Sequence, residues 1–410
     1  MRFYLNDMLY AISYALDNVE REYRGISLHH AERVAYMSVQ MGRAYGLDTT
    51  ALMNLAVVGV LHDNAFTEYY KMLDKIPTLM DGRPGMSPDE MAAAIRPHCE
   101  MGERNVKVLP FYSDIKNAVL FHHENADGSG AFGISADETP LYARLLQLSD
   151  QLDNQFILEY VDEHTYKKII DYLEENVDHL FTREMVDLFR SAFPEPMKGT
   201  LSYAMIRQML QGDLPHVLEE YNAADVRGLA TVIARIIDYK SKFTCTHSLG
   251  IARKSSEMGH YLGYDEELCT KLYLAGALHD VGKLTIPSDI LEKPDRLTER
   301  EFSVMKTHAI ASWNILRTID GLDDVVDWAC MHHEKLNGSG YPFGRTADQL
   351  CRNARLLCCT DIYQALREER PYKEAISHDQ AISVMREMVA NGLIDAELTE
   401  AMDKCFSGRN

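Results

Sequence analysis

The segment LYLAGALHDVGKLTIP, residues 272–287, ends an apolar run with an adjacent histidine and aspartate. Leu272, Ala275 and His279 recur at helical spacing, so the imidazole of His279 is expected to point the same way as the buried side chains. A buried polar group without a partner costs roughly 2–7 kcal/mol. The pair His279 and Asp280 therefore needs either backbone hydrogen bonds at a capped helix end or a metal ion. Further ligands elsewhere in the chain decide between these two alternatives.

Composition limits the kinds of protein this chain can be. It has 410 residues, of which 46% are hydrophobic, enough for two or three domains with their own cores. The 42 basic and 62 acidic side chains give a formal net charge of −20. Such a surface repels long nucleic acids, whose binding depends on basic side chains neutralising phosphates. A phosphate ligand would have to be small and held by a local cluster of cations.

The termini and cysteines indicate where the protein works. The first residues, MRFYLNDMLYAISYALDNVERE, form an amphipathic pattern with acidic residues, unlike a signal peptide. No stretch approaches the roughly 18 uninterrupted apolar residues of a transmembrane helix. The eight cysteines are scattered without a CxxC pair and include the adjacent Cys358 and Cys359. We therefore expect a cytoplasmic protein with reduced thiols and no membrane partner.

Helical spacing of apolar residues runs through almost the whole chain, interrupted by short breaks such as 81–90 and 193–200. The predicted class is all-α. The second break lies near mid-chain, and the same series of histidines and aspartates occurs on each side of it. In the second half the series is His247, His279, Asp280, His308, His332, His333 and Asp361. In the first half it is His30, His62, Asp63, His98, His122, His123 and Asp150.

The spacing of the two series indicates a tandem duplication. Matching residues are 217 positions apart for the first histidine and the HD pair, 210 for the later histidines and 211 for the last aspartate. The spacing shortens by seven residues, from 217 to 210, across the Pro/Gly-rich break of the first half. We predict two helical-bundle domains, 1–194 and 223–410, joined by a helical linker at 195–222.

The repeated residue types favour metal binding over a structural role. A lone histidine in a helix is usually structural, but the same set in the same order in both halves is not explained that way. Asp361 lies on an apolar stripe with Ala354, Leu357 and Cys358, where an ionised carboxylate needs a cation. Histidines with two carboxylates suit Fe, Mn or Zn better than Mg or Ca. Six or seven ligands suffice for two ions sharing Asp280, an arrangement that can hydrolyse phosphodiesters.

The second half resembles the HD-GYP family, a helical branch of the HD metal-dependent phosphohydrolases. The matching segments span about 190 residues, namely HS at 247–248, HDVGK at 279–283, His308, HHE at 332–334, GSGYP at 338–342, DIYQAL at 361–366 and RPYK at 370–373. The resemblance implies hydrolysis of cyclic di-GMP or a related cyclic dinucleotide. It implies one divalent metal at His247, His279, Asp280 and Asp361, and a second at Asp280, His308 and His332 with His333 close by. It also implies phosphate contacts from Lys283, Arg370 and Lys373.

The sequence departs from the family pattern in two places. Members with a third metal carry a glutamate four residues before the first histidine, where this chain has Phe243, so we expect two metals. In the first half, Phe66 replaces the lysine, Ala131 and Phe132 replace Tyr-Pro, and Glu159 and Asp162 replace the later cations. We therefore expect a further metal centre there that does not hydrolyse cyclic dinucleotides. The alternative is a duplicated scaffold whose histidines persist for packing.

The function predicted from the sequence is a cyclic dinucleotide phosphodiesterase, with Asp280 and Lys283 catalytic and the first half regulating or scaffolding the second. The alternative is a non-catalytic sensor of metal or nucleotide, acting through a partner. The three predicted phosphate contacts favour the enzyme, because a metal sensor needs no cations for phosphate. Cyclic di-GMP is the first choice of substrate; cyclic GMP-AMP, the end product and a homodimer or signalling partner are left open. Tyr341 and Pro342 are expected to shape a loop.

Overall fold

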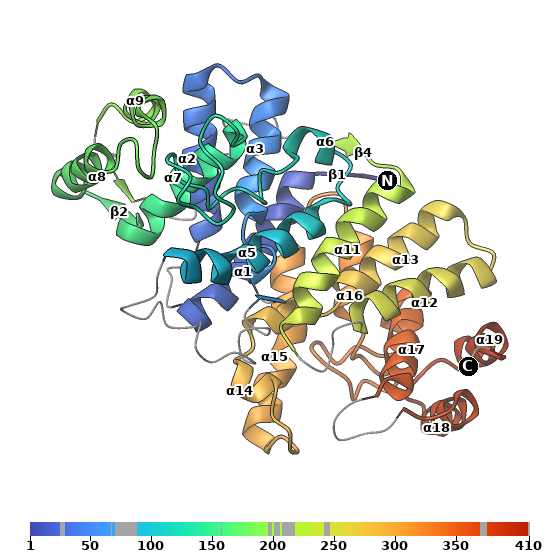
Figure 1. Ribbon diagram of the computed structural model, residues 1–410. Helices are drawn as coiled ribbons and strands as arrows, with labels where there is room; N and C mark the ends of the chain where they lie inside the picture. Colours follow the sequence, from blue (N-terminus) through green and yellow to red (C-terminus); the bar gives the residue numbers. More distant parts are fainter. Residues whose placement is uncertain are drawn as a thin grey trace. The chain divides into compact units, whose positions relative to one another are not determined.

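The computed structural model describes residues 1–24, 29–66, 68–69, 88–156, 158–195, 199–200, 206, 218–241, 247–369 and 375–408 (Figure 1). Its regular structure is helical apart from two pairs of two-residue strands, so the predicted all-α class is confirmed. The chain divides into two compact units. One, the first-half unit, is Leu16–Val217; the other, the second-half unit, combines Met1–Ala15 with Leu218–Asn410.

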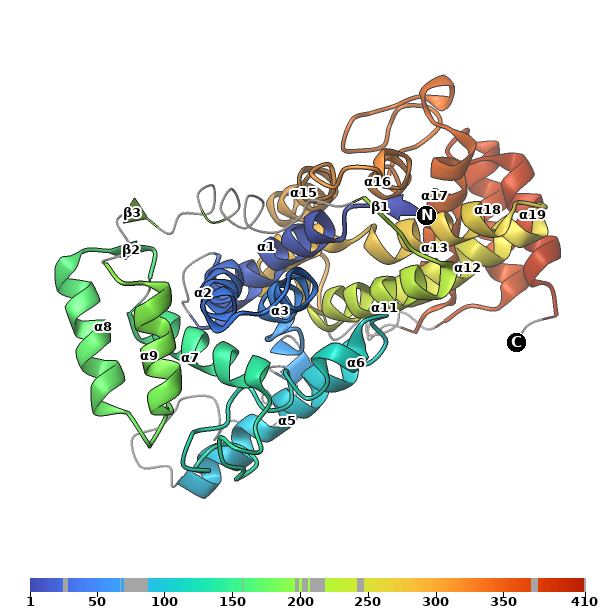
Figure 2. The same cartoon turned by 90° about the horizontal axis from the view of Figure 1, so that it is seen from above.

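The first-half unit is a bundle in which α2 packs against α3, α7 and α9, and α2 and α3 lie side by side in blue in Figure 2. Helix α1, Leu5–Arg24, contains the boundary between the units. The other elements are α2 (His30–Tyr45), α3 (Thr49–Leu61), α5 (Pro88–Val106), α6 (Tyr112–Ile115), α7 (Leu141–Phe156), β2 (Tyr160–Val161), α8 (Glu163–Glu175), α9 (Arg183–Ala192) and β3 (Gly199–Thr200).

The second-half unit is built around α12, which packs against α11, α13, α17 and α19. Its elements are β1 (Arg2–Phe3), β4 (Glu219–Glu220), α11 (Ala223–Tyr239), α12 (His247–Tyr261), α13 (Glu266–Leu278), the 3-10 helix η1 (Val281–Thr285), α14 (Ser288–Leu291), α15 (Glu299–Leu316), α16 (Asp323–Cys330), the 3-10 helix η2 (Ala347–Gln349), α17 (Arg352–Arg367), α18 (His378–Ala390) and α19 (Ala396–Phe406).

The first residues of the chain belong to the second-half unit, although the predicted first domain, 1–194, included them. Strand β1 pairs antiparallel with β4, with Arg2 opposite Glu220 and Phe3 opposite Glu219. The ring of Phe3 lies 4.7 Å from that of Tyr221, and the terminal amine donates to the Tyr221 carbonyl at 2.9 Å. These long-range contacts, which a local pattern cannot reveal, attach the N-terminus to the second half.

The predicted helical linker, 195–222, falls mostly outside the described residues. Its described parts include the short strands β3 and β4, of which β3 pairs with β2. The seven cysteines that the structure describes are free thiols; five are buried, whereas Cys351 is exposed and Cys405 is partly exposed. Among the described helices, none combines the length and apolarity that crossing a membrane requires.

The duplication is visible in how each unit forms its central helix pair. Asp48 and Asp265, 217 residues apart, each cap a helix by accepting a backbone N–H three residues on. Gly59 and Gly276 allow these helices to approach their neighbours closely, because an added Cβ would lie 2.6 Å from Ala35 Cα and 2.8 Å from Ala252 Cα. This close crossing brings the HD pair at the end of one helix to the first histidine of the other.

Candidate metal centres

Five separate elements carry the candidate ligands of the second-half unit. His247 is the first residue of α12, His279 and Asp280 follow α13, and His308 lies within α15. His332 and His333 follow α16, and Asp361 lies on α17. Apart from His333, which is partly exposed, all of them are buried, although they come from positions up to 114 residues apart in the chain.

The Asp280 carboxylate is at the centre of this group, and its two oxygens face different histidines. The Oδ2 atom lies 2.9 Å from His279 Nε2 and 3.9 Å from His247 Nε2. The Oδ1 atom lies 3.4 Å from His308 Nε2 and 3.8 Å from His332 Nε2. A carboxylate with this arrangement can bridge two cations, one on each oxygen.

A second carboxylate and an ammonium complete the group. Asp361 Oδ1 lies 3.4 Å from His247 Nε2, and its Oδ2 lies 3.9 Å from His333 Nδ1. The Lys283 Nζ atom lies 2.5 Å from Asp280 Oδ2, on the same oxygen as His279. Lys283 is therefore directly beside the residue that we expect to share two metals.

The hydrogen bonding of three buried histidines tests whether these residues fit a metal. The Nδ1 atoms of His279, His308 and His332 donate to the backbone carbonyls of Gly276, Met305 and Ala329, at 2.8, 2.6 and 2.6 Å. A carbonyl only accepts, so each Nδ1 carries a proton, and in the neutral ring the Nε2 atom presents a lone pair. Within the described chain these Nε2 atoms, and Asp280 Oδ1, are buried without a hydrogen-bond partner.

Lone pairs on neutral imidazoles would face carboxylate oxygens here, a repulsive arrangement that bound metal ions relieve. The nitrogen-rich donor set and its tautomers fit two divalent transition-metal ions. Burial lowers the pKa of His308, and it lowers that of His333 to about 3, so both rings are neutral. Burial alone would raise the pKa of Asp280, but His279 and Lys283 hold it well below its usual range. The neutral rings of His308 and His333 and the ionised carboxylate of Asp280 are thus in the protonation states that bind metal.

Residues outside the predicted set hold these ligands in place. Glu368 Oε2 lies 2.7 Å from His247 Nδ1, and its position seven residues after Asp361 places it on the same helical face. That spacing was the signal by which the sequence could have revealed it. The Ser312 hydroxyl donates to the His279 carbonyl at 3.0 Å and accepts the Gly282 N–H at 2.9 Å. An added Cβ on Gly282 would lie 2.0 Å from the His308 carbonyl, so only glycine fits there.

Glu334 fixes the loop that follows the two adjacent histidines. Its buried carboxylate accepts the N–H groups of Phe343 at 2.7 Å and Arg345 at 3.0 Å. This loop places the Tyr341 ring 4.7 Å from the His333 ring. Burial raises the pKa of Tyr341, and the charges of Asp280 and Asp361 raise it further, so its hydroxyl remains a donor. Tyr341 was predicted only to shape a loop, but its ring lies beside the candidate ligand His333.

Replacing Glu334 with alanine should loosen this loop, because two backbone N–H groups lose the buried carboxylate that accepts them. Each charge-assisted hydrogen bond contributes about 1.5–3 kcal/mol. We expect faster amide hydrogen exchange at Phe343 and Arg345 and a lower midpoint of urea unfolding. The matched change Glu387→Ala, at an exposed position of α18, should leave both unchanged. Unaltered exchange at the two amides in the Glu334 variant would contradict this role.

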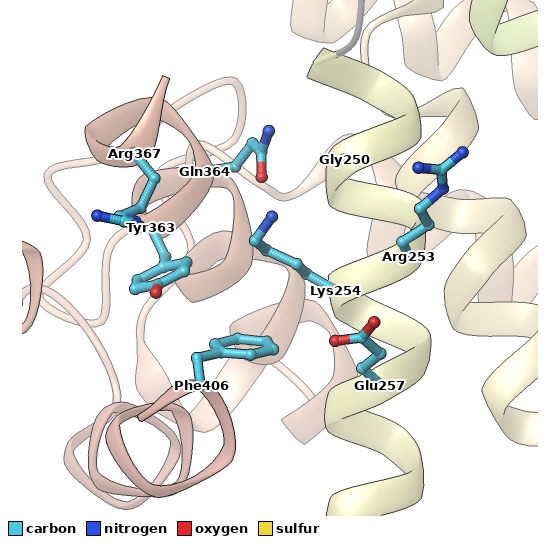
Figure 3. A pocket seen from close by; sticks show the side chains of 8 residues that line it. All are labelled: Gly250, Arg253, Lys254, Glu257, Tyr363, Gln364, Arg367 and Phe406. Atoms are coloured by element: carbon cyan, nitrogen blue, oxygen red, sulfur yellow. The ribbon is translucent and has the colours of Figure 1, made fainter. Parts of the chain in front are cut away.

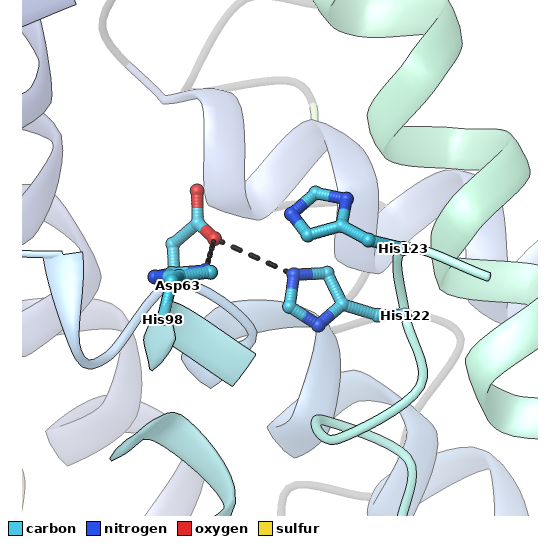
Figure 4. A group of neighbouring side chains, drawn as sticks. All are labelled: Asp63, His98, His122 and His123. Atoms are coloured by element: carbon cyan, nitrogen blue, oxygen red, sulfur yellow. Dashed lines mark hydrogen bonds and ion pairs between the residues drawn. The ribbon is translucent and has the colours of Figure 1, made fainter. Parts of the chain in front are cut away.

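The first-half unit brings its own set together in a related way. His62 Nδ1 donates to the Gly59 carbonyl at 2.8 Å and His122 Nδ1 to the Val119 carbonyl at 2.6 Å. Among the described residues their buried Nε2 atoms have no hydrogen-bond partner. Figure 4 shows Asp63 facing His98 and His122, with His123 beside them; Asp63 Oδ1 lies 2.8 Å from His98 Nε2 and 3.7 Å from His122 Nε2.

The remaining first-half residues surround Asp150. Its Oδ1 atom lies 3.1 Å from His30 Nε2 and 3.6 Å from His62 Nε2, and its Oδ2 lies 3.9 Å from His123 Nδ1. All seven predicted first-half residues therefore meet at one place, and they fit a metal by the same argument. Asp153, which the sequence analysis missed, bonds His30 Nδ1 at 2.6 Å and occupies the supporting role of Glu368.

The chemistry around the first-half set differs from that of the second. Phe66, at the position of Lys283, is buried and supplies no charge. Asp162, predicted to replace a phosphate-binding cation, instead caps α8 by accepting the Thr165 N–H at 2.7 Å. In the second half, Phe243, Arg370 and Lys373 lie outside the described residues, so their predicted roles remain predictions.

Comparison with known proteins shows the family. A family model described as an HD domain matches twice, over residues 21–184 and 231–398. The chain belongs to the HD domain family. The two matched segments also repeat the duplication seen in the sequence, and they confirm the HD-type relationship inferred from it.

Individual relatives of this HD protein cover either the whole chain or one half. A 3'3'-cGAMP-specific phosphodiesterase 1 from Vibrio cholerae is 26% identical over 412 residues, covering 97% of this chain and 91% of the relative. A cyclic di-GMP phosphodiesterase from Pseudomonas aeruginosa is 31% identical over 192 residues, 46% of this chain and 45% of the relative. The crystal structure of V. cholerae V-cGAP3, a phosphodiesterase described as specific for cyclic GMP-AMP, has the same fold, with a TM-score of 0.66 at 20% identity over 100% of this chain and 99% of that one.

Proposed function

We propose that the second-half unit is a metal-dependent phosphodiesterase that hydrolyses a cyclic dinucleotide. The observation that carries this proposal is the position of Asp280, whose two oxygens face separate groups of histidines and one of which contacts Lys283. Two metal ions that share a carboxylate, with an ammonium group beside them, can bind an anionic phosphate ester. The names of the relatives support the same class of substrate.

The protein side chains divide the work of this reaction between them. Bound metal ions would activate a water nucleophile and neutralise charge on the scissile phosphate. His247, His279, Asp280 and Asp361 would hold one ion, and Asp280, His308 and His332, with His333 close by, the other. Lys283 would move from Asp280 to a phosphate oxygen, where its charge stabilises the transition state. The Tyr341 hydroxyl, protonated and next to His333, can donate to the substrate.

We further propose 3'3'-cGAMP, rather than the cyclic di-GMP expected from the sequence, as the preferred substrate. Two V. cholerae relatives that match 97% and 89% of this chain are named as 3'3'-cGAMP-specific. The cyclic di-GMP phosphodiesterase of P. aeruginosa covers 46% of the chain. The relatives that share the tandem arrangement therefore favour the mixed dinucleotide.

The test is hydrolysis of both cyclic dinucleotides by the full chain, loaded with Fe or Mn under reducing conditions. Products are separated by chromatography, and metal content is measured on the same sample. We expect turnover of both cyclic dinucleotides, with kcat/KM higher for 3'3'-cGAMP. Full metal occupancy without turnover of either substrate would favour the alternative, a non-catalytic sensor. Faster turnover of cyclic di-GMP would contradict the proposed substrate preference but not the proposed phosphodiesterase activity.

Replacing Lys283 with alanine should lower kcat by about 10- to 100-fold, the effect of losing one charge-assisted contact of about 1.5–3 kcal/mol. Lys283 contacts Asp280 without being a candidate ligand, so the metal content should stay at the parental value. Arg300→Ala, at an exposed position on α15, serves as the control. If metal is lost together with activity, Lys283 supports the centre and does not contact phosphate.

A further inference from the structure

A cavity of about 370 Å³ lies between α12, α17 and α19 of the second-half unit (Figure 3). Lys254 extends from α12 into the space between the helices; Arg253, on the other side of α12, and Arg367 of α17 also line the cavity, with their guanidinium groups directed away from Lys254. Phe406 of α19 and Tyr363 of α17 form an apolar wall, their rings stacked at 5.2 Å. The volume is in the range of small-molecule sites, and a few polar groups on an apolar wall are typical of them.

This cavity lies behind the metal centre and not within it. His247 directs its Nε2 toward Asp361 and Asp280, and its Nδ1 toward Glu368. The amide of Gln364 donates to Glu368 Oε1 and lines the cavity. The cavity is therefore on the Nδ1 side of His247, away from the side on which we expect the metals.

The charge of the lining is opposite to that of the protein. Three basic side chains and the single acidic Glu257 give the lining a formal charge of +2, on a chain of −20. Lys254 makes no ion pair with any carboxylate that the structure describes, and burial lowers its pKa. Arg367 donates one N–H to the Ile376 carbonyl at 2.7 Å, and its guanidinium has further donors.

Gln364 closes one side of this cavity. It is 6% exposed, and its amide nitrogen donates to Glu368. The cavity thus offers cations and an apolar wall, a combination that recognises an organic phosphate.

The first half provides an internal comparison, because the matching positions are known. Gly250 corresponds to Arg33, whose buried guanidinium bonds Asp153 at 2.6 and 2.8 Å. Lys254 corresponds to Met37, which is fully buried. In the second half, the Gln364 side chain packs directly against Gly250, because an added Cβ there would lie 2.3 Å from Gln364 Nε2. The ammonium of Lys254 is therefore specific to the second half, since the matching residue of the first half is Met37.

We propose that this cavity binds a phosphomonoester, such as a nucleoside 5′-monophosphate, at a site separate from the metal centre. A phosphomonoester carries a charge of about −1.5 to −2 at pH 7, which matches the +2 of the lining. Arginine and lysine are the side chains that bind phosphate oxygens best. The sugar and base would lie along Phe406, within reach of Gln364 and Glu257. This binding does not depend on the proposed hydrolysis.

The experiment is calorimetric titration of the metal-loaded full chain with GMP, inorganic phosphate and succinate. We expect saturable GMP binding, weaker phosphate binding and the weakest binding of succinate, which is a dicarboxylate. The double variant Arg253→Glu, Lys254→Glu should weaken GMP binding by about tenfold or more at one site. Its neutral counterpart, Arg253→Gln, Lys254→Gln, should weaken it less. Because Arg253 is exposed and Lys254 half-buried, both variants should keep the parental unfolding temperature and hydrolysis rate.

The control Arg300→Glu reverses one positive charge, as each substitution of the double variant does. Arg300 lies on α15, outside the cavity lining. It should leave GMP binding unchanged. Three results would overturn the proposal: no saturable GMP binding, equal affinity for GMP and succinate, or parental GMP affinity and stoichiometry in the charge-reversed variant. If GMP binds only at the metal centre, the cavity variants will bind it as the parent does, which is the third of these results.

Discussion

Replacing Asp280 with alanine is expected to lower hydrolysis of the cyclic dinucleotide by at least about 10²–10⁴-fold and to release or loosen both metal ions. The two oxygens of Asp280 face both groups of histidines, His279 on one side and His308 on the other. Without it, each ion loses a ligand, and the link between the two ions is gone. Metal content by plasma mass spectrometry and kcat on the same preparation measure the two effects together.

Asp295→Ala is the matched control, since Asp295 is exposed and lies between α14 and α15. It should retain parental metal content and turnover. Asp280→Asn is a useful second variant because it keeps the shape of the side chain while removing its charge, and it should also lose activity. Hydrolysis within about threefold of the parent in the alanine variant would show that two metals do not share this residue.

Changing His279 and Asp280 together to alanine should abolish hydrolysis, whereas changing His62 and Asp63 together should lower the metal count and leave hydrolysis. Both pairs are buried at the end of the central helix pair of their unit. Only the second pair has a lysine three residues after the aspartate; the first has Phe66. Metal per chain and turnover, measured on both full-length variants, separate the two roles.

The two variants control for each other, because each removes the same two side chains from an equivalent helix end. Thermal unfolding of both establishes that a buried pair has been removed without loss of the fold. Turnover that survives in the His279 and Asp280 variant would assign hydrolysis to the first half. An intact metal count in the His62 and Asp63 variant would favour the alternative in which the first-half histidines serve packing. A partial loss of rate there would indicate that the first half regulates the second.

The sequence alone determined the helical class, and it predicted the composition of both candidate ligand sets. Helical periodicity marks the faces that are buried, and a histidine or aspartate on such a face stands out because it needs a partner. The repeat made this signal specific, since Asp63 and Asp280 recur with their histidines at matching spacing.

The tertiary structure alone decided what each buried group contacts. Glu368 and Asp153 support equivalent histidines but follow the aspartate of each half by seven and three residues, so the repeat could not pair them. The N-terminal strand joins the second half through a partner more than 200 residues away. The cavity beside Lys254 is lined by residues of α12, α17 and α19 that are up to 156 positions apart in the sequence. Periodicity identifies a buried face, but the packing of residues distant in sequence determines what that face meets.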